Sequence, residues 1–247
     1  MIKFLPSYVG AKSYWIESLQ PYKDSNIVEL FAGSAVISAN LAKTAVINDL
    51  DPIIYKVFSN YDQLIVPEVF SEADYYQHRQ DADWWKYLYC FQKMSFSGVF
   101  RYSKNGYNVP MKKGYIDNVS LQADYKEALD RFKQLNPTVL NLSYDSVPLD
   151  LLSGKVVVLD PPYQNKQASY NDTKTKKKDV FDYPKYWDYV RNLTTIAQTV
   201  IVFDTQDNIR NNLKGFANVM GLQTRKMRVN GKHDGDLEAM CILGERK

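Results

Sequence analysis

The sequence is poor in the residues that metal and redox chemistry require. Cysteine occurs only at Cys90 and Cys241, and histidine only at His78 and His233. The two cysteines show neither a metal-ligand spacing nor a disulfide framework, which predicts a chain without a metal in a reducing cytoplasm. His233 stands beside two acids in a glycine-containing turn, a pattern more typical of a hairpin tip than of a metal site.

Several motifs and runs are also missing. No stretch approaches the roughly 20 apolar residues of a membrane span. Pro6 interrupts the N-terminus before the apolar region of a signal peptide could form. There is no Gly-x-Gly-x-x-Gly fingerprint for a dinucleotide pyrophosphate and no Gly-x-Ser-x-Gly elbow of a hydrolase. These absences favour a protein without membrane spans and disfavour dinucleotide enzymes and serine hydrolases.

The overall composition is that of an ordinary globular protein. The chain has 247 residues, of which 45% are hydrophobic and 24% charged, with a net charge of +3. It is long enough for one large domain or for a domain with an inserted lobe. Because the net charge is small, a nucleic-acid site would have to be a local basic patch. The 19 tyrosines could serve base stacking, although most aromatic residues fill cores and surfaces.

One apolar run stops at a carboxylate followed by two prolines. Residues 156–159 are apolar and mostly β-branched, which predicts a strand buried on both faces of a parallel sheet. Asp160 then lies at the carboxyl end of that strand, where open α/β sheets place their ligand crevice. Pro161 and Pro162 stiffen the exit and leave carbonyls that can accept hydrogen bonds, and Tyr163 offers a flat stacking surface at the mouth. This combination suits the exocyclic amino group of a planar base.

The first third of the chain predicts a nucleoside-binding half of a sheet. A strand over 26–31, a small-residue turn at 32–35 and a helix to about 41 form its first unit, and a second strand covers 45–48. Asp49, at the tip of that second strand, is placed to accept hydrogen bonds from two ribose hydroxyls. Asp51 before Pro52 instead predicts a helix cap with proline at the first helical position.

Residues 62–136 interrupt the alternation of strands and helices. They contain an aromatic helix predicted over 81–94, a hairpin predicted over 100–110 with Asn105-Gly106 as its two-residue turn, and an amphipathic helix over 119–135. Arg101, Lys104, Lys112 and Lys113 form a basic ribbon that could enter a groove of DNA or could be an ordinary solvated surface.

The remaining chain resumes the alternation. The lysine-rich stretch 164–180 is predicted to be a loop that either clamps phosphates or is merely solvated, and its position after Asp160 favours the clamp. A glycine-rich turn at 231–235 predicts a closing hairpin. The other expected strands are 138–142, 199–203, 222–230 and 236–243, and the other expected helices are 10–19, 183–198 and 208–213.

Five blocks in this order resemble the Dam-like (D12 class) adenine-N6 DNA methyltransferases, which use S-adenosylmethionine. The blocks are Tyr8-Val9-Gly10-Ala11-Lys12, Glu29-Leu30-Phe31-Ala32-Gly33-Ser34-Ala35, Asn48-Asp49-Leu50-Asp51, Phe96 to Tyr102 with Gly106 to Pro110, and Asp160-Pro161-Pro162-Tyr163. Arg225, Arg228 and Glu238 are similar to the closing hairpin of that family.

The resemblance implies an α/β fold: a Rossmann-like class I methyltransferase sheet formed by residues 1–61 and 137–247. The mostly helical insertion 62–136, which carries the β-hairpin, would be the DNA-recognition lobe. The cofactor would be S-adenosylmethionine, leaving S-adenosylhomocysteine as product, with no metal. The implied cofactor-binding residues are Tyr8, Lys12, Phe31, Gly33, Ser34, Asp49, Asp145 and Asp160.

The resemblance also implies the reaction. The target adenine leaves the duplex, Tyr163 stacks on it, and the Asp160 carboxylate and the Pro161 carbonyl accept its two N6 hydrogens. The implied catalytic residues are Asp160, Pro161, Pro162 and Tyr163. The implied DNA-binding residues are Arg101, Tyr102, Lys104, Asn108, Pro110, Lys112, Lys113, Lys176 and Lys177.

Two departures from the family affect the expected DNA site. Ser7 stands where relatives usually have Lys, and Ser97 where they usually have Asn. Arg101 keeps the position of a guanine-reading arginine, so we expect a short site that contains adenine rather than full reading of GATC.

The expected partner is double-stranded DNA, with no membrane, in a bacterial or phage-infected cell, and the chain is expected to be a monomer or weak dimer. Cytosine-N4 methylation, and a catalytically silent DNA-binding regulator on the same fold, remain as alternatives.

Overall fold

A computed structural model describes residues 1–5, 8, 10–117, 119–163, 181–216, 219–229 and 232–244. Its seven-stranded sheet has the order β10-β11-β9-β8-β1-β2-β7. Neighbouring strands from β9 to β7 are parallel, while β11 runs antiparallel to β9 and to β10. The strands are β1 Ser25–Glu29, β2 Ala42–Asn48, β7 Thr138–Leu140, β8 Val156–Leu159, β9 Thr199–Thr205, β10 Val219–Val229 and β11 Lys232–Leu243.

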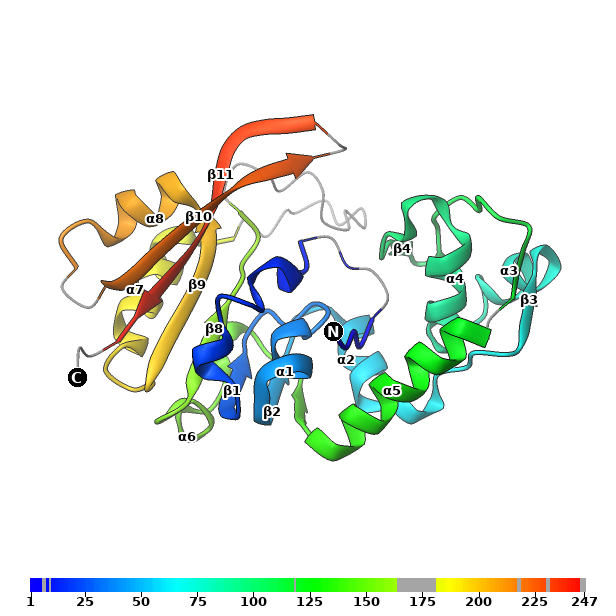
Figure 1. The fold of residues 1–247 in the computed structure, drawn as a ribbon, viewed down its shortest axis with the longest axis horizontal. Helices are drawn as coiled ribbons and strands as arrows, with labels where there is room; N and C mark the ends of the chain where they lie inside the picture. The colour runs from blue at the N-terminus through cyan, green and yellow to red at the C-terminus, as the bar shows by residue number, and fades with distance from the viewer. Residues whose placement is uncertain are drawn as a thin grey trace.

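Helices cover both faces of this sheet, and a group of helices lies beside it (Figure 1). The α-helices are α1 Val36–Leu41, α2 Pro52–Ser59, α3 Glu72–His78, α4 Leu88–Met94, α5 Val119–Leu135, α6 Leu149–Leu152, α7 Tyr183–Leu193 and α8 Gln206–Leu213. Two short ribbons, β3 Val69–Ser71 with β6 Tyr115–Asp117 and β4 Tyr102–Ser103 with β5 Gly106–Tyr107, lie in the lateral group. The fold is therefore α/β with a mostly parallel sheet, as predicted.

Strand β8 shows why the sheet needs two helical layers. All four of its residues are buried, and its side chains alternate between two hydrophobic cores. Val156 and Val158 join the core that contains α1, whereas Val157 and Leu159 join the core that contains α7 and α8. A strand that is apolar on both faces is stable only when both faces are covered.

The middle of the sheet is a topological switch point. Strand β1 pairs with β2 on one side and with β8 on the other, and the chain continues outward in both directions. In open α/β sheets a ligand crevice forms beyond the carboxyl ends of strands at such a point. Strand β1 ends there at Glu29, the first residue of the second block, and β8 ends at Leu159, immediately before Asp160.

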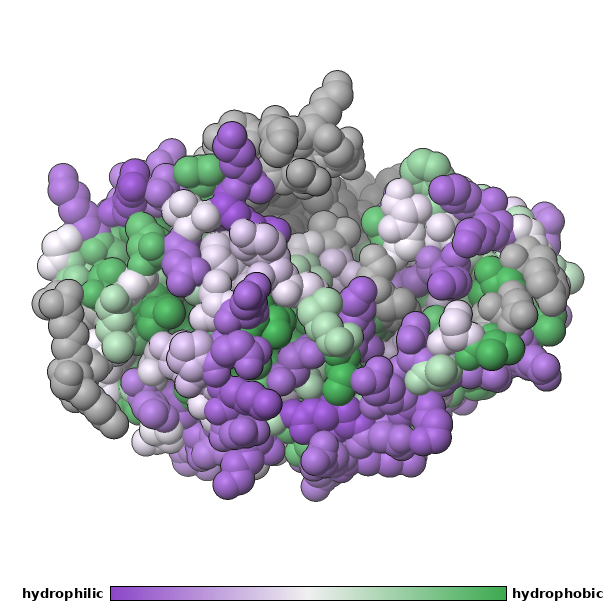
Figure 2. All heavy atoms as spheres, viewed as in Figure 1, coloured by the Kyte–Doolittle hydropathy of each residue, from purple (hydrophilic) through white to green (hydrophobic). Residues whose placement is uncertain are grey.

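Helix α5 connects the lateral group to the sheet. It spans the predicted residues, and its Arg131 donates through Nε and Nη2 to the carbonyls of Ala39 and Ala42, at the end of α1 and the start of β2. Its outer face is hydrophilic along the lower edge of the molecule (Figure 2). The division at residues 62 and 136 remains a proposal about domains.

Several local predictions were wrong. Of the helix expected over 10–19, only the 3-10 helix Lys12–Trp15 forms, and turns follow it. The helix expected over 81–94 is a 3-10 helix, Trp84–Tyr87, followed by α4, and it buries the adjacent Trp84 and Trp85 together. The helix expected to reach residue 198 ends at Leu193, where the hydroxyls of Thr194 and Thr195 donate back to the carbonyls of Arg191 and Asn192. The strand expected from residue 236 begins earlier, since β11 starts at Lys232.

The hairpin turn is shifted by one residue from the prediction. Tyr102 pairs with Tyr107 and Ser103 with Gly106, so the turn residues are Lys104 and Asn105. Gly106 opens the second strand with φ 96°. A Cβ at Gly106 would stand 2.0 Å from the carbonyl oxygen of Arg79, so close packing on that backbone, rather than the turn alone, requires glycine.

Candidate active site

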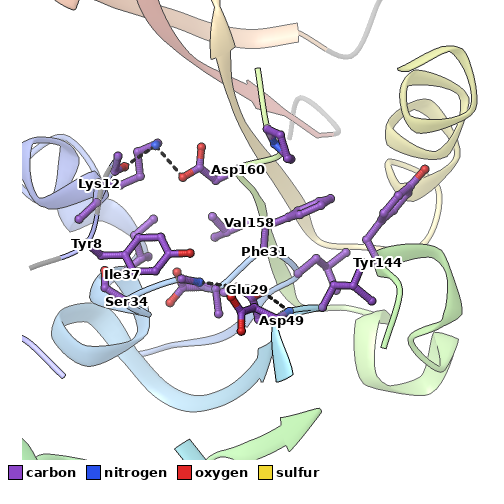
Figure 3. A pocket seen from close by; sticks show the side chains of 18 of the residues that line it. Tyr8, Lys12, Glu29, Phe31, Ser34, Ile37, Asp49, Tyr144, Val158 and Asp160 are labelled. Carbon is purple, nitrogen blue, oxygen red and sulfur yellow. Dashed lines mark hydrogen bonds and ion pairs between the residues drawn. The ribbon is translucent and has the colours of Figure 1, made fainter. Parts of the chain in front are cut away.

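A cavity of about 360 Å³ lies at the carboxyl ends of β1, β2 and β8 (Figure 3). It brings together residues from four of the five sequence blocks. Those of its lining residues that the sequence predicted to bind the cofactor are Tyr8, Lys12, Phe31, Gly33, Ser34, Asp49 and Asp160. Asp49 and Asp160 are thus joined by a single cavity, although 111 positions separate them in the chain.

The Asp160 side chain is partly open, with 25% of its surface exposed. Lys12 Nζ lies 2.6 Å from Asp160 Oδ2 and also donates to the carbonyl of Gly10 at 2.6 Å. Burial raises the pKa of Asp160 to about 6, and the charge of Lys12 opposes that rise. The resemblance implies a contact between Lys12 and the cofactor; in the structure the Lys12 ammonium pairs with the Asp160 carboxylate.

Asp49 is held by backbone donors at the tip of β2. Its Oδ2 accepts from Gly33 N at 2.8 Å and its Oδ1 from Asp51 N at 2.9 Å. Burial raises the pKa of Asp49 to about 6, even though these two hydrogen bonds favour its charged form. A carboxylate has about four acceptor sites, so Asp49 retains capacity for hydroxyl donors of a ligand. Asp51 caps α2 as predicted, accepting from Ile53 N and Ile54 N.

Glu29 is a third carboxylate of the cavity, and the sequence analysis assigned it no role. It is buried at the end of β1, where its Oε1 accepts from Ser38 N at 2.7 Å. Burial raises its pKa to about 7, and the nearby Asp160 charge adds to the rise. An acid inside the apolar strand 27–31 was the signal in the sequence. The carboxyl groups of Glu29, Asp49, Asp51 and Asp160 all line this one cavity and favour a ligand that carries positive charge.

The turn after β1 approaches an aromatic ring. Gly33 has φ 48°, and a Cβ there would stand 2.8 Å from a ring carbon of Tyr8. Tyr8 in turn faces Phe100, with ring centroids 5.7 Å apart. Glycine at 33 therefore allows the turn, the N-terminal segment and the lateral group to meet at one wall of the cavity.

The opposite wall is aromatic (Figure 3). Phe31 and Tyr144 are stacked with ring centroids 5.3 Å apart, and both line the cavity. Asp145, predicted as a contact for the adenine of the cofactor, is not among the lining residues. Its carboxylate pairs with Lys185 Nζ at 2.5 Å and accepts from Ser143 Oγ at 2.5 Å. Ser143 and Tyr144 line the cavity in its place.

The segment after Asp160 is more enclosed than the sequence suggested. The carbonyl of Pro162, expected to be free, accepts from Tyr183 Oη at 2.8 Å. Tyr163, expected as an open plate at the mouth, has only 7% of its surface exposed, and its hydroxyl donates to Glu238 Oε1 at 3.0 Å. Proline stiffness and aromatic character are visible in a sequence, but a partner 75 positions away is not.

Most of the predicted DNA-binding residues that the structure describes are exposed. Lys104, Pro110, Lys112 and Lys113 are exposed, as is Arg101. Arg101 donates through Nε to Asn108 Oδ1 at 2.9 Å and through Nη2 to the Asn108 carbonyl at 3.0 Å, so the hairpin fixes its own arginine. Lys176 and Lys177 lie outside the described residues.

Tyr102 does not present its hydroxyl to solvent. The hydroxyl donates to Asp51 Oδ1 at 2.7 Å and so ties the hairpin to the cap of α2 beside the cavity. The structure therefore gives Tyr102 a bridging contact where the sequence predicted a contact with DNA.

Phe96 is an exposed residue that the sequence analysis did not single out as a DNA contact. Its ring is 62% exposed, next to Ser97 with φ 61°, and Lys112 Nζ lies 5.9 Å from the ring centroid. An exposed aromatic ring beside lysines offers a stacking surface next to the basic ribbon.

The described residues hold neither a metal-binding cluster nor a membrane-spanning helix. No group of three or more His, Cys, Asp or Glu side chains in this part of the chain could hold a metal ion. No helix within the same residues is long and apolar enough to cross a membrane.

Comparison with known families gives one extensive match. Residues 8–227 match the sequence profile described as D12 class N6 adenine-specific DNA methyltransferase. This range covers most of the chain and includes every block that carried the resemblance.

Solved structures show only a weak similarity. SMU.1697c from Streptococcus mutans, in complex with SAH, is 8% identical with a TM-score of 0.43, covering 93% of this chain and 96% of that one. PH1948 from Pyrococcus horikoshii is 12% identical with a TM-score of 0.42, covering 97% and 85%. SMU.776, complexed with SAH, is 12% identical with a TM-score of 0.42, covering 91% of this chain but 46% of its own.

Proposed function

Because the chain belongs to the D12 class N6 adenine-specific DNA methyltransferase family, we propose that it transfers a methyl group from S-adenosylmethionine to N6 of an adenine rotated out of duplex DNA. The observation that supports this most is the single cavity that joins Asp49, at the tip of β2, to Asp160, after β8. The end of the cavity at Asp49 suits a nucleoside, and the end at Asp160 suits an amino group.

The cavity fits the proposed cofactor by its chemistry. Asp49 can accept from the two ribose hydroxyls, and the stacked Phe31 and Tyr144 provide an apolar wall for a flat base. Glu29 and Asp160 would favour a cationic group between them, since burial and mutual repulsion make their own charges costly. When bound, S-adenosylmethionine supplies an electrophilic methyl group.

The chain itself positions the acceptor. The Asp160 carboxylate and the Pro161 carbonyl would accept the two hydrogens on N6, which turns the nitrogen lone pair away from the ring and towards the methyl donor. The Asp160 carboxylate would also take the proton that the amine loses on methylation. The ring of Tyr163 would support the base, with its hydroxyl fixed by Glu238.

The lateral helices would carry the contacts to DNA. The target amine is paired inside a duplex, so the base has to leave the stack before it can reach Asp160. Arg101, oriented by Asn108, would read guanine, and a bidentate contact of that kind is worth about 1 to 3 kcal/mol of discrimination. Exposed Phe96 would stack on bases next to it.

Identifying the methylated nucleoside tests the proposal directly. The protein is incubated with methyl-labelled S-adenosylmethionine and duplex DNA, and the DNA is digested to nucleosides. Label in N6-methyladenine is the expected result. Label in N4-methylcytosine would show the alternative acceptor chemistry, and binding of DNA without any label would indicate a regulator on the same fold.

The acid limb of the pH profile should report the buried carboxyls. The pKa values of Asp49 and Asp160 are raised to about 6 and that of Glu29 to about 7. Since an amine donates to a carboxylate and not to a protonated acid in the same place, turnover should fall as the pH decreases through 6. The measurement is the initial rate at saturating DNA and cofactor, taken between about pH 5 and pH 8.

Stability should change in the opposite direction. A carboxyl whose folded pKa is raised stabilises the fold most below its unfolded pKa and loses that contribution as the pH rises through the folded pKa. The contribution of Glu29 and Asp49 should therefore make the Tm of the free protein higher near pH 5 than above pH 7. Glu29→Gln should flatten the dependence, and an unchanged slope in this variant would contradict the assignment.

A further inference from the structure

The carboxylate of Glu238, on β11, has four polar partners beside the proposed catalytic loop. Its side chain is buried, with 3% of the residue exposed. Oε1 accepts from Tyr163 Oη at 3.0 Å, and Oε2 accepts from Trp15 Nε1 at 3.1 Å and from Arg225 Nε. Lys12 Nζ lies 3.5 Å from Oε1. One carboxylate thus joins the N-terminal 3-10 helix, the closing hairpin and the residue after the two prolines.

Lys12 lies between two carboxylates. Its ammonium is 2.6 Å from Asp160 Oδ2 and 3.5 Å from Glu238 Oε1, and the residue is only 5% exposed. It also lies 5.5 Å from the ring centroid of Tyr163. A buried ammonium needs a compensating charge wherever it rests. Glu238 is the group that could keep Lys12 compensated while Asp160 turns its oxygens to another donor.

We propose that Glu238 is a positioning residue of the transfer reaction, which holds the Tyr163 ring in place and shares Lys12 so that the Asp160 carboxylate is available to the amine of the substrate. This inference rests on the proposed function. Glu238 touches neither substrate nor cofactor in this scheme; it acts through Tyr163, Lys12 and Asp160.

The charge of Glu238, and not only its hydrogen bonds, matters for this role. Burial alone would raise the pKa of Glu238, but Lys12 and Arg225 outweigh it and hold that pKa below its ordinary value, so the group is a carboxylate. Two cations and two carboxylates balance in the cluster. Glutamine at 238 could still form hydrogen bonds, but it would leave Asp160 as the remaining carboxylate within 4 Å of Lys12 among the described residues.

Glu238→Gln is the direct test, with Glu17→Gln as matched control, at an exposed position two residues after the Glu238 partner Trp15. We expect kcat to fall about 10- to 100-fold while KM for DNA and cofactor stays within about 3-fold, because the lost interaction acts in the transition state. The control should match the wild type. Unchanged kcat, or a rise in KM alone, would overturn the proposal.

The pH profile separates this role from a merely structural one. Glu238 raises the pKa of Asp160 by charge repulsion, whereas Lys12 lowers it. Without the Glu238 charge, the acid limb should move to lower pH; an unmoved limb would contradict the proposal. Among the described residues, the other charged or titratable groups that influence Asp160, or are influenced by it, are Tyr163, Glu29, Asp49, Tyr186 and Asp204.

A second variant keeps the test independent of any folding defect. Tyr163→Phe removes the donor to Glu238 and keeps the ring, so it should lower kcat less than Glu238→Gln, and the double variant should lose less than the product of the two factors. Multiplicative losses would show that Glu238 does not act through Tyr163.

Failure of the proposed function would be visible separately. If the wild type methylates no DNA, ¹³C NMR titration of the Asp160 carboxyl still compares its pKa in the wild type and in Glu238→Gln. A lower pKa in the variant supports the coupling through Lys12, and equal values overturn it.

Discussion

Asp160→Ala should abolish turnover while leaving most of the binding to DNA. The variant removes the carboxylate that would accept from the target amine, so the lost interaction is made fully only during transfer, and a reduction in kcat on the order of 10³-fold is expected. Asp160 is partly exposed, and Lys12 keeps Glu238 and the Gly10 carbonyl as partners, so the fold should survive. Single-turnover methylation and DNA binding, measured on the same preparation, separate a loss of methyl transfer from a loss of DNA binding.

Two companion variants sharpen this test. Asp160→Asn keeps the shape and one acceptor oxygen but loses the charge, so its rate should lie between those of the wild type and the alanine variant. Asp150→Ala changes an exposed acid of α6, just before the opposite end of β8, and should leave the rate unchanged. Turnover by Asp160→Ala at the wild-type rate would remove this carboxylate from the mechanism.

Local signals explain why parts of the fold could be predicted. Strand β8 was predicted from four apolar residues, and α5 from its amphipathic pattern, because each pattern reflects burial along one element. The Asp51-Pro52 pair correctly predicted the start of α2, since a cap and a proline at the first helical position depend only on neighbouring residues.

Predictions that depended on distant packing were less successful. The hairpin turn lies one residue earlier than predicted, and the glycine at 106 is required by close packing on the backbone of Arg79, 27 positions earlier. In the cavity, residue types indicated Asp49 and Asp160 as candidates, but nothing in the sequence showed that Lys12 pairs with Asp160 or that Tyr163 is buried against Glu238. Such pairings arise only when the N-terminal segment, β8 and β11 come together.

The affinity for DNA should decrease steeply with salt if the exposed cations of the lateral group contact phosphates. Arg101, Lys104, Lys112 and Lys113 are exposed on one segment, and Lys112 and Lys113 also line a cavity of about 510 Å³ with Lys3 and Lys93. About 4 phosphate contacts predict a loss of affinity of about 10²-fold between about 50 and 200 mM salt, because each contact releases condensed counterions. Fluorescence anisotropy with a labelled duplex measures this slope.

Paired substitutions assign the slope to this surface. Lys112→Gln with Lys113→Gln should weaken binding similarly for all sequences and reduce the magnitude of the slope by about 2, since each phosphate contact contributes about 1. Lys23→Gln with Lys43→Gln removes the same charge from exposed positions near the amino ends of β1 and β2, away from the cavity. Because both pairs change the net charge equally, only contact with phosphates predicts a difference between them. Equal slopes for the two pairs would show that Lys112 and Lys113 do not hold DNA, and that the lateral group reaches the duplex by another face.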